Sequence, residues 1–260
     1  MIFPLLPVLL GYSQVALSHN PLASGEQEQL ASLAGALLLA LFWLAYMAGS
    51  RRRPPQWHHG LYFHAGIALC FVATLGPLDE LAETSAAAHM AQHMLFMVVI
   101  TPLWVLARPL PQIAASGGKF LILIWQPLLR FALNPMLAAW LHGAVIWFWH
   151  IPVFYLFALE NPWWHIIEHA CFVVSAGLFW WAVLNSTHRN APWALLALLL
   201  TLMHTGFLGA ILTFARAPLY GDGRGLEDQQ LAGLIMWVAG AIPYLMASVG
   251  IGSGWYRKMH

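Results

Sequence analysis

The sequence predicts an all-α protein, a polytopic bundle of about seven transmembrane helices, and three observations support this. Hydrophobic residues make up 60% of the 260 positions and charged residues only 8%, against roughly 25% charged in an ordinary soluble domain. The apolar residues gather in stretches of roughly 20, the length that crosses a bilayer. Basic residues fall in alternate connections between these stretches. The apolar surface must therefore face lipid.

Residues 1–29 are predicted to be an apolar N-terminal segment and a lead-in on the outer face. An apolar run ends before Ala16-Leu17-Ser18, which has the small-x-small pattern of a signal-peptidase site, but no Lys or Arg precedes it. Two alternatives stay open. The segment is either a cleaved signal peptide, which would make His19 the new N-terminus, or an uncleaved segment packed on the outer face.

The membrane bundle is predicted over residues 30–251, followed by a short cytoplasmic tail at 252–260. A stretch from Lys119 to Leu133 precedes the helix-breaking Asn134-Pro135, and we interpret it as an interfacial helix lying on the membrane. The predicted spans are 30–49, 61–78, 89–107, 135–152, 164–184, 193–214 and 229–251.

Charge placement predicts the orientation. Nine of the eleven basic residues fall on one side, and only Arg216 and Arg224 fall on the other, together with nine of the ten acids. The basic side is expected to be cytoplasmic, which places the C-terminus inside and the N-terminus outside. We expect a multi-pass protein of a bacterial inner (plasma) membrane. The nine basic residues on the predicted cytoplasmic side are Arg51, Arg52, Arg53, Arg108, Lys119, Arg130, Arg189, Arg257 and Lys258.

The net charge of +1 and the lack of a basic, aromatic-interleaved patch exclude nucleic acid as a partner. Membrane lipid is the expected surrounding. Two cysteines, Cys70 and Cys171, lie in apolar runs without a C-x-x-C motif, and packing explains them. The sequence does not predict an oligomeric state.

Thirteen histidines in so apolar a chain need an explanation, because ionisable side chains inside a membrane are costly. His89 and His93 open one predicted helix from the outside, and His165 and His169 open another with the same spacing. Residues four apart share one helix face, so each pair can reach one ion. With His150 at the same depth, these histidines predict a metal site between helices on the outer, periplasmic side.

Nearby residues favour copper. Met90, Met94 and Met97 accompany the first histidine pair, and thioether ligands suit Cu(I) whereas imidazole suits several metals. Either Cu(I) or Cu(II) is compatible. Glu168, adjacent to His169, could accept a hydrogen bond from the N–H group of a ligating imidazole.

Two further histidines, His142 and His204, are predicted near the membrane midplane. They could form an additional station for an ion or simply bridge two helices, and both interpretations stay open.

Four groups of residues carry a family signal: His89 to Leu95 with Pro102, Trp149 to Pro152 with Tyr155, His165 to His169 with Phe179 to Trp181, and Pro218 to Tyr220 with Glu227 to Val238. Together they resemble the CtaG family of cytochrome c oxidase assembly factors over roughly residues 30–250. The chain departs from the family pattern at Asn134-Pro135, where a His-Pro pair is expected, and at His204, where no fixed histidine is expected.

The resemblance implies a copper-binding assembly factor, a metallochaperone rather than an enzyme. It implies that copper is delivered to a haem–copper oxidase subunit during maturation, with a periplasmic copper donor as a further partner. The implied ligands are His89, His93, His150, His165 and His169.

Two other functions compete. A haem b electron-transfer protein would use His142 and His204 as axial ligands. A membrane di-iron oxygenase also uses His-x-x-x-His motifs, but it needs more ligands, and its site is expected to face the cytoplasm.

Overall fold

The computed structural model describes residues 26–259 and shows helices and no strand among them, which confirms the predicted fold class. The predicted N-terminal segment lies outside the described residues up to residue 25. The α-helices are α2 (Glu26–Ser50), α3 (Trp57–Leu75), α4 (Pro77–Thr84), α5 (Ala86–Met94), α6 (Thr101–Ala107), α7 (Leu110–Ala115), α8 (Lys119–Phe131), α9 (Pro135–Trp149), α10 (Pro152–Glu160), α11 (Pro162–Leu184), α12 (Ala191–Thr213), α13 (Leu226–Leu234) and α14 (Ala241–Arg257).

Within residues 26–259, five stretches are long and apolar enough to cross a membrane, and two bent helix pairs raise the number to as many as seven. This agrees with the prediction of about seven spans. The bent pairs are α3 with α4, at 44°, and the second half of α8 with α9, at 108°. The five apolar stretches are Gln27–Ser50, Ala86–Ala107, Pro162–Leu184, Ala191–Thr213 and Leu226–Arg257.

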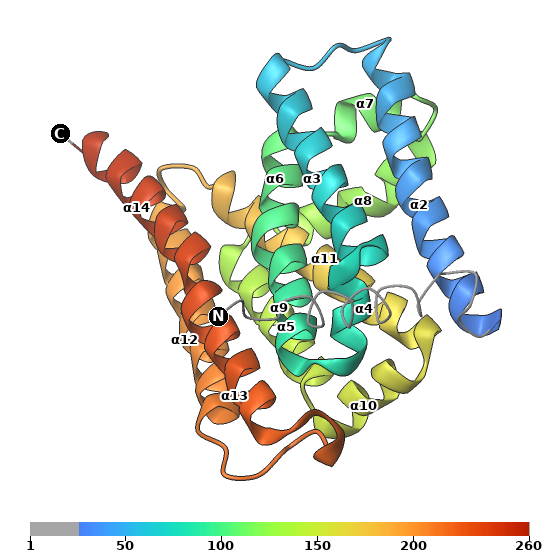
Figure 1. Cartoon of the computed structure of the whole chain (residues 1–260). Helices are drawn as coiled ribbons and strands as arrows, with labels where there is room; N and C mark the ends of the chain where they lie inside the picture. The colour runs from blue at the N-terminus through green and yellow to red at the C-terminus, as the bar shows by residue number, and fades with distance from the viewer. Residues whose placement is uncertain (1–25, 260) are drawn as a thin grey trace, which may run out of the picture.

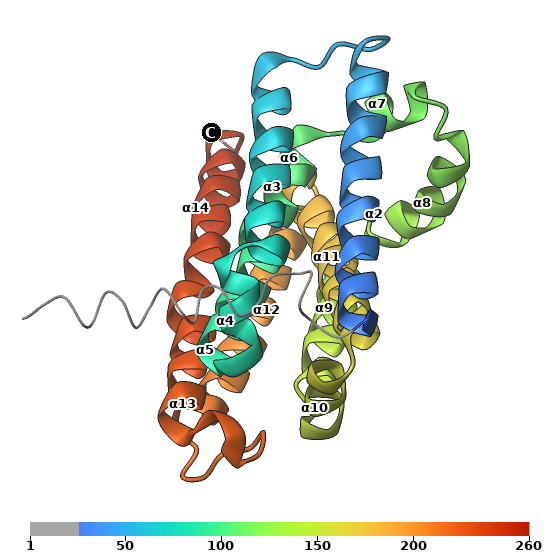
Figure 2. The same cartoon turned by 45° about the vertical axis from the view of Figure 1, so that its right-hand side comes forward.

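The connections gather at two ends of the bundle (Figures 1 and 2). The α2–α3 connection and α7 lie at one end, and α10 and α13 lie at the other. At the first end, Arg52 Nη1 donates a hydrogen bond of 2.7 Å to the Ala115 carbonyl, and Gln112 Nε2 donates one of 3.2 Å to the Arg53 carbonyl. The basic connections are therefore brought together, as the charge pattern requires.

The α8–α9 angle fits the predicted interfacial helix. Trp125, Leu128 and Leu129 of α8 pack against a small buried cluster that includes Leu178 of α11. The sharp turn follows Asn134, whose side chain accepts hydrogen bonds from the first backbone amides of α9, because Pro135 starts a new helix well and cannot continue the old one.

Two transmembrane stretches contain π-helical segments, η1 (Leu95–Ile100) and η3 (Ile235–Ala239). A π turn leaves backbone carbonyls without their usual helical partner. In η1, the Met97 carbonyl accepts hydrogen bonds from Trp180 Nε1 at 2.8 Å and from Thr101 Oγ1 at 2.9 Å. The irregular turn is thus satisfied by side chains and tied to α11, directly after the histidines of α5.

Close helix contact at glycine brings α13 onto α12. A methyl group added at Gly233 would lie 2.5 Å from the Gly209 carbonyl oxygen and 2.6 Å from the Thr213 amide nitrogen. Only glycine allows the two backbones to approach this far. This contact holds α13, which also packs on α5, against α12.

Candidate metal centre

The first turn of α5 is held at its N-terminus from two sides. The Ser85 hydroxyl accepts a hydrogen bond of 3.1 Å from the Ala88 amide, in the usual manner of an N-cap. Asp228 of α13 accepts from the Ser85 hydroxyl at 2.8 Å and from the amides of Ala86 and Ala87. A carboxylate at a helix N-terminus is also favoured by the helix dipole.

Gln92 fixes how α5 is turned about its axis. Its Nε2 donates hydrogen bonds of 2.7 Å to the Ala73 carbonyl and 2.6 Å to Asp79 Oδ1. These partners lie on either side of the bend between α3 and α4. Because Gln92 faces this bend, His89 and His93 face the interior, where each has a relative exposure of 1%.

The second histidine pair is placed by the start of α11. Asn161 accepts hydrogen bonds from the amides of Trp163 and Trp164, and Pro162 occupies the first turn. The helix therefore starts at a defined residue, and His165, Glu168 and His169 follow on adjoining positions of its inner face. The ring centroids of His165 and His169 are 4.2 Å apart.

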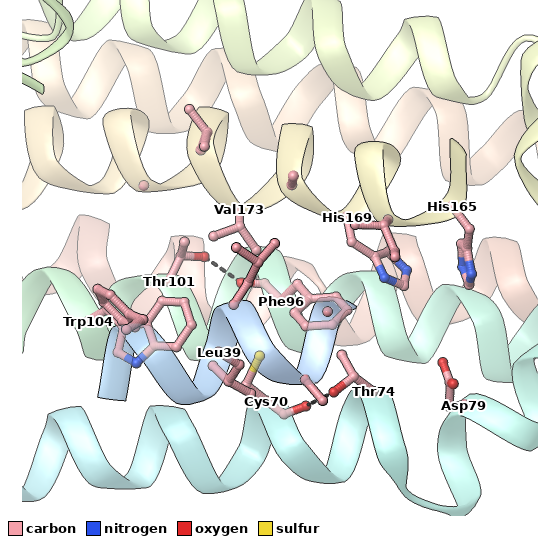
Figure 3. Close-up of a pocket in the computed structure, with 18 of the residues that line it drawn as sticks. Leu39, Cys70, Thr74, Asp79, Phe96, Thr101, Trp104, His165, His169 and Val173 are labelled. Carbon is pink, nitrogen blue, oxygen red and sulfur yellow. Dashed lines mark hydrogen bonds between the residues drawn. The ribbon is translucent and has the colours of Figure 1, made fainter. Parts of the chain in front are cut away.

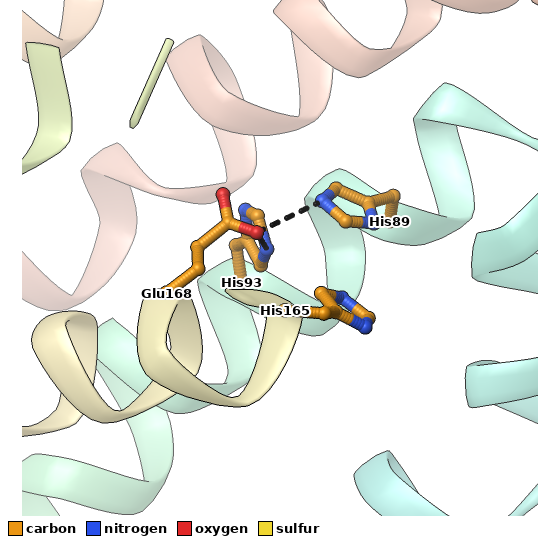
Figure 4. A group of neighbouring side chains, drawn as sticks. All are labelled: His89, His93, His165 and Glu168. Atoms are coloured by element: carbon orange, nitrogen blue, oxygen red, sulfur yellow. Dashed lines mark ion pairs between the residues drawn. The ribbon is translucent and has the colours of Figure 1, made fainter. Parts of the chain in front are cut away.

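The two pairs meet between α5 and α11, and Figure 4 shows His89, His93 and His165 of these pairs together with Glu168. His89 and His165 lie nearly parallel with centroids 5.2 Å apart, and His93 and His169 lie edge to face at 5.3 Å. The carboxylate of Glu168 faces both histidines of α5, His89 and His93. Its Oε2 atom is 4.0 Å from Nε2 of His89 and 3.8 Å from Nε2 of His93.

The structure therefore assembles a group of four possible ligands: His89, His93, His165 and Glu168. One ligand atom of each lies within 4.8 Å of the others. Four ligand atoms about 2.0–2.2 Å from one ion in a tetrahedron lie roughly 3.5 Å apart. Closing the group around an ion needs inward shifts of about an ångström, which side-chain rotation can supply.

His89, His93 and Glu168 are buried, His165 is half-buried, and most of the polar atoms of this group lack hydrogen bonds. Both ring nitrogens of His89 and His93, both carboxylate oxygens of Glu168, and Nε2 of His165 and His169 have no hydrogen-bond partner in the described part of the chain. Each buried, unpaired polar group costs about 1–3 kcal/mol. So many unpaired atoms in one place make this group a candidate site for a positively charged ligand.

His169 and His150 adjoin the four-residue group. His169 packs edge-on against His93 and also contacts Phe96. The predicted ligand His150 ends α9. Its Nδ1 lies 2.7 Å from the Ile146 carbonyl oxygen, so Nδ1 carries the proton and Nε2 keeps a free lone pair. Phe172, which contacts the rings of both His93 and His150, lies beside them.

The three methionines belong to the main hydrophobic core. A methyl group added at Gly240 would lie 2.9 Å from the Met94 sulfur, so this thioether packs on the start of α14. Their burial, with Met90 at 2% and Met97 at 0% exposure, is explained by packing. The thioethers therefore no longer strengthen the inference of copper.

Arg224, Tyr155 and Tyr220 cover the side of the site next to His89. Arg224, from the connection before α13, donates hydrogen bonds from Nη1 to the Tyr155 hydroxyl at 2.9 Å and from Nη2 to the Ala82 and Glu83 carbonyls. Tyr155 stacks on Tyr220 at 4.0 Å and lies edge-on to His89 at 5.4 Å. Burial raises the pKa of the Tyr155 phenol to about 12, against the opposing influence of the neighbouring Arg224.

Sequence reasoning did not assign a role to Arg224 or Asp228. One signal was available for Arg224, because it is one of only two basic residues on the predicted outer side. An isolated cation among many acids is expected to have a specific partner. The hydrogen bonds to Tyr155 and to the end of α4 provide it.

A cavity of about 1070 Å³ leads to the second histidine pair. Figure 3 shows Asp79, His165 and His169 at one end and Trp104 at the other, with Cys70 and Phe96 between them. The cavity lining also includes Glu28, Glu83 and Glu160. It therefore joins an acidic region to the imidazoles.

The two remaining predicted residues, His142 and His204, lie together in a different place. Both are on helices that pack against each other, α9 and α12, and neither belongs to the four-residue group.

Comparison with known families gives one match. The family model described as cytochrome c oxidase caa3 assembly factor (Caa3_CtaG) matches residues 40–258, which is most of the chain. No curated protein and no solved structure is similar enough to count as a match.

Proposed function

Because the chain belongs to the Caa3_CtaG family of cytochrome c oxidase assembly factors, we propose that it binds a copper ion between α5 and α11 and passes that ion to the oxidase during assembly. The ion is cargo in this scheme, and the protein acts as a metallochaperone rather than an enzyme. The proposed ligands are His89, His93, His165 and Glu168, with His169 and His150 as neighbouring imidazoles onto which the ion moves.

The observation that carries the proposal is the absence of hydrogen bonds to this buried group within the described residues. In a folded protein, buried polar atoms are nearly always paired. A cation would satisfy the imidazole lone pairs and the Glu168 carboxylate together. Each of these four side chains supplies a nitrogen or oxygen donor from a helix held by its own cap.

Copper is favoured by the ligands and by the family. Imidazole suits copper, zinc, iron and nickel alike, so the donor set alone leaves the metal open. Copper is an essential metal of haem–copper oxidases, and an assembly factor of this enzyme has a reason to bind it. Glu168 supplies one negative charge, which balances a bound Cu(I) and leaves one net positive charge with Cu(II).

The cavity supports an entry route from the outer face. Asp79, Glu83 and Glu160 line it together with His165 and His169, and acidic groups raise the local concentration of cations. With the basic connections on the cytoplasmic side, the acidic end of the cavity would face the periplasm of a bacterial inner membrane. A periplasmic copper donor would deliver the ion there.

Metal analysis of the purified protein tests this function. We expect copper in the wild-type protein purified from copper-supplemented cells, and loss of the outer-site copper from a His89→Ala/His93→Ala/His165→Ala/His169→Ala variant. His188→Ala is the matched control, because His188 is exposed in the connection before α12. Zinc, iron and nickel are measured in the same samples.

Oxidase activity in membranes from the same strains provides the second readout. The quadruple variant should lower oxidase activity, and added copper should restore part of it. Equal copper content in the wild type and the quadruple variant would refute the site. A strong Soret band in the wild type would instead support the haem b alternative.

A further inference from the structure

A second group of polar side chains lies deeper in the bundle, among α9, α11 and α12. It consists of His142, Ser175, Thr201 and His204. His142 and Thr201 have no exposed surface, and Ser175 has 3%. His142 lies eight residues before His150 on α9, which is about 12 Å along the helix axis. The group is therefore separate from the outer cluster.

Ser175 sets the tautomer of His142. The Ser175 hydroxyl donates a hydrogen bond of 3.4 Å to the Phe172 carbonyl, and its oxygen lies 3.0 Å from Nδ1 of His142. We assign the hydroxyl proton to the Phe172 carbonyl, and with this assignment Nδ1 of His142 is the donor to Ser175. Nε2 then carries a free lone pair, and it has no hydrogen-bond partner in the described part of the chain.

His204 comes from the neighbouring helix to the same level. A methyl group added at Gly143 would lie 2.8 Å from Nε2 of His204 and 3.1 Å from its Cε1. The His204 ring thus lies against the backbone of α9 at the residue next to His142. Both of its ring nitrogens lack hydrogen bonds to described residues, and so does the hydroxyl oxygen of Thr201, one helical turn away.

We propose that His142 and His204 bind a second metal ion, a two-coordinate Cu(I). The site offers two neutral imidazoles and no acidic residue, and the cost of burying an ion rises with the square of its charge. A monovalent ion that accepts two nitrogen ligands is therefore the fitting class. The contact at Gly143 leaves no room for a porphyrin between α9 and α12 at this level.

Binding of an ion at His142 and His204 does not require the outer cluster. It would add a second metal site to the one in the proposed function. The same serine arrangement would hold His142 in the ligand tautomer before the ion arrives, as a backbone carbonyl does for His150. Ordering of the unbound imidazole lowers the entropic cost of binding.

Anaerobic titration of the detergent-purified full-length protein with Cu(I), against a chromophoric Cu(I) chelator, tests the proposal. We expect two Cu(I) per chain in the wild type and in His188→Ala. One Cu(I) is expected in His204→Leu, in His142→Asn, and in the outer variant His89→Ala/His93→Ala/His165→Ala/His169→Ala. X-ray absorption of the outer variant loaded with Cu(I) should show two nitrogen ligands and no sulfur.

Each result separates the two sites. If His204→Leu binds as many ions as the wild type, the inner site is wrong and the proposed function stands. If the outer variant still binds two ions, the proposed outer site is wrong and the inner one stands. Retention of the outer ion by His204→Leu also shows that this variant is folded. A sulfur ligand, or more than two nitrogen ligands, in the outer variant would overturn the two-imidazole site.

Discussion

The Oε2 atom of Glu168 lies 3.8 Å from the Nε2 atom of His93, with both side chains 1% exposed. The sequence had suggested that Glu168 would support a ligating imidazole from behind. Because it lies among the histidines, we propose that it is a direct ligand and supplies the balancing charge.

Glu168→Gln should therefore weaken copper binding without destabilising the metal-free protein. The amide keeps the size of the side chain but removes its charge, and we expect affinity to fall by at least roughly 10–100-fold. The metal-free variant should unfold at the same temperature or higher, because a buried carboxylate without hydrogen bonds is costly. Chelator competition and thermal unfolding measure the two quantities. Glu227→Gln, at an exposed position, is the control. A lower melting temperature with unchanged affinity would mean that Glu168 is purely structural.

Copper should stabilise the folded protein. A ligand that binds only the folded state adds about 2.7 kcal/mol when its free concentration is one hundred times its dissociation constant. We expect the melting temperature to rise on copper addition and to return to the starting value after chelation. In the His89→Ala/His93→Ala variant the rise should be reduced. An identical rise in both proteins would place the stabilising ion elsewhere.

Asp228→Ala should destabilise the protein through α5. The substitution removes the acceptor used by Ser85, Ala86 and Ala87, and loss of a charged cap costs about 1–2 kcal/mol. Thermal unfolding in detergent should show a decrease of several degrees. Glu227→Ala changes the adjacent exposed carboxylate and should leave the melting temperature unchanged. Equal effects of the two variants would argue against the cap.

Gly233→Ala should disturb the contact between α12 and α13. The added methyl would meet backbone atoms of Gly209 and Thr213 at 2.5–2.6 Å, and overpacking of this kind costs about 1–3 kcal/mol. Gly206→Ala is the matched control, because its methyl would lie 3.4 Å from the Trp237 ring and alanine favours the helix by up to about 1 kcal/mol. The two variants should shift the melting temperature in opposite directions.

Trp180→Phe should destabilise the π-helical segment η1. The variant loses the hydrogen bond to the Met97 carbonyl, and together with the lost packing we expect a cost of about 1–2 kcal/mol. Trp181→Phe removes the indole of the next residue, which is half-buried, and should cost less. Similar losses in both variants would show that packing, rather than the hydrogen bond, holds the segment.

Much of the fold follows from the sequence because a bilayer imposes simple rules. Apolar length predicts the spans. A spacing of four residues predicts that His89 and His93 share one face of their helix and that His165 and His169 share one face of theirs. The site could be predicted to this extent. Hydropathy does not distinguish an α turn from a π turn, so η1 and η3 were not predicted.

Long-range contacts account for the rest of what was not predicted. Nothing local in the sequence indicates that Asp228 caps α5 or that Arg224 binds the end of α4, because each contact joins residues more than 140 positions apart. The orientation of Glu168 likewise depends on how α11 is turned against α5. Helix periodicity places Glu168 beside His165 and His169 but does not say which neighbour it faces.

The contacts of Arg224 and Asp228 also have a consequence for biosynthesis. Ribosomes make α5 and α11 well before the segment that carries these two residues, so neither the cap on α5 nor the cover over His89 can form until the last transmembrane stretch is being inserted. The bundle would then acquire its complete metal centre only as a finished polypeptide. Incomplete chains that lack α13 would hold the start of α5 by its Ser85 cap alone, and their histidines would lack the cover that Arg224 and Tyr155 provide.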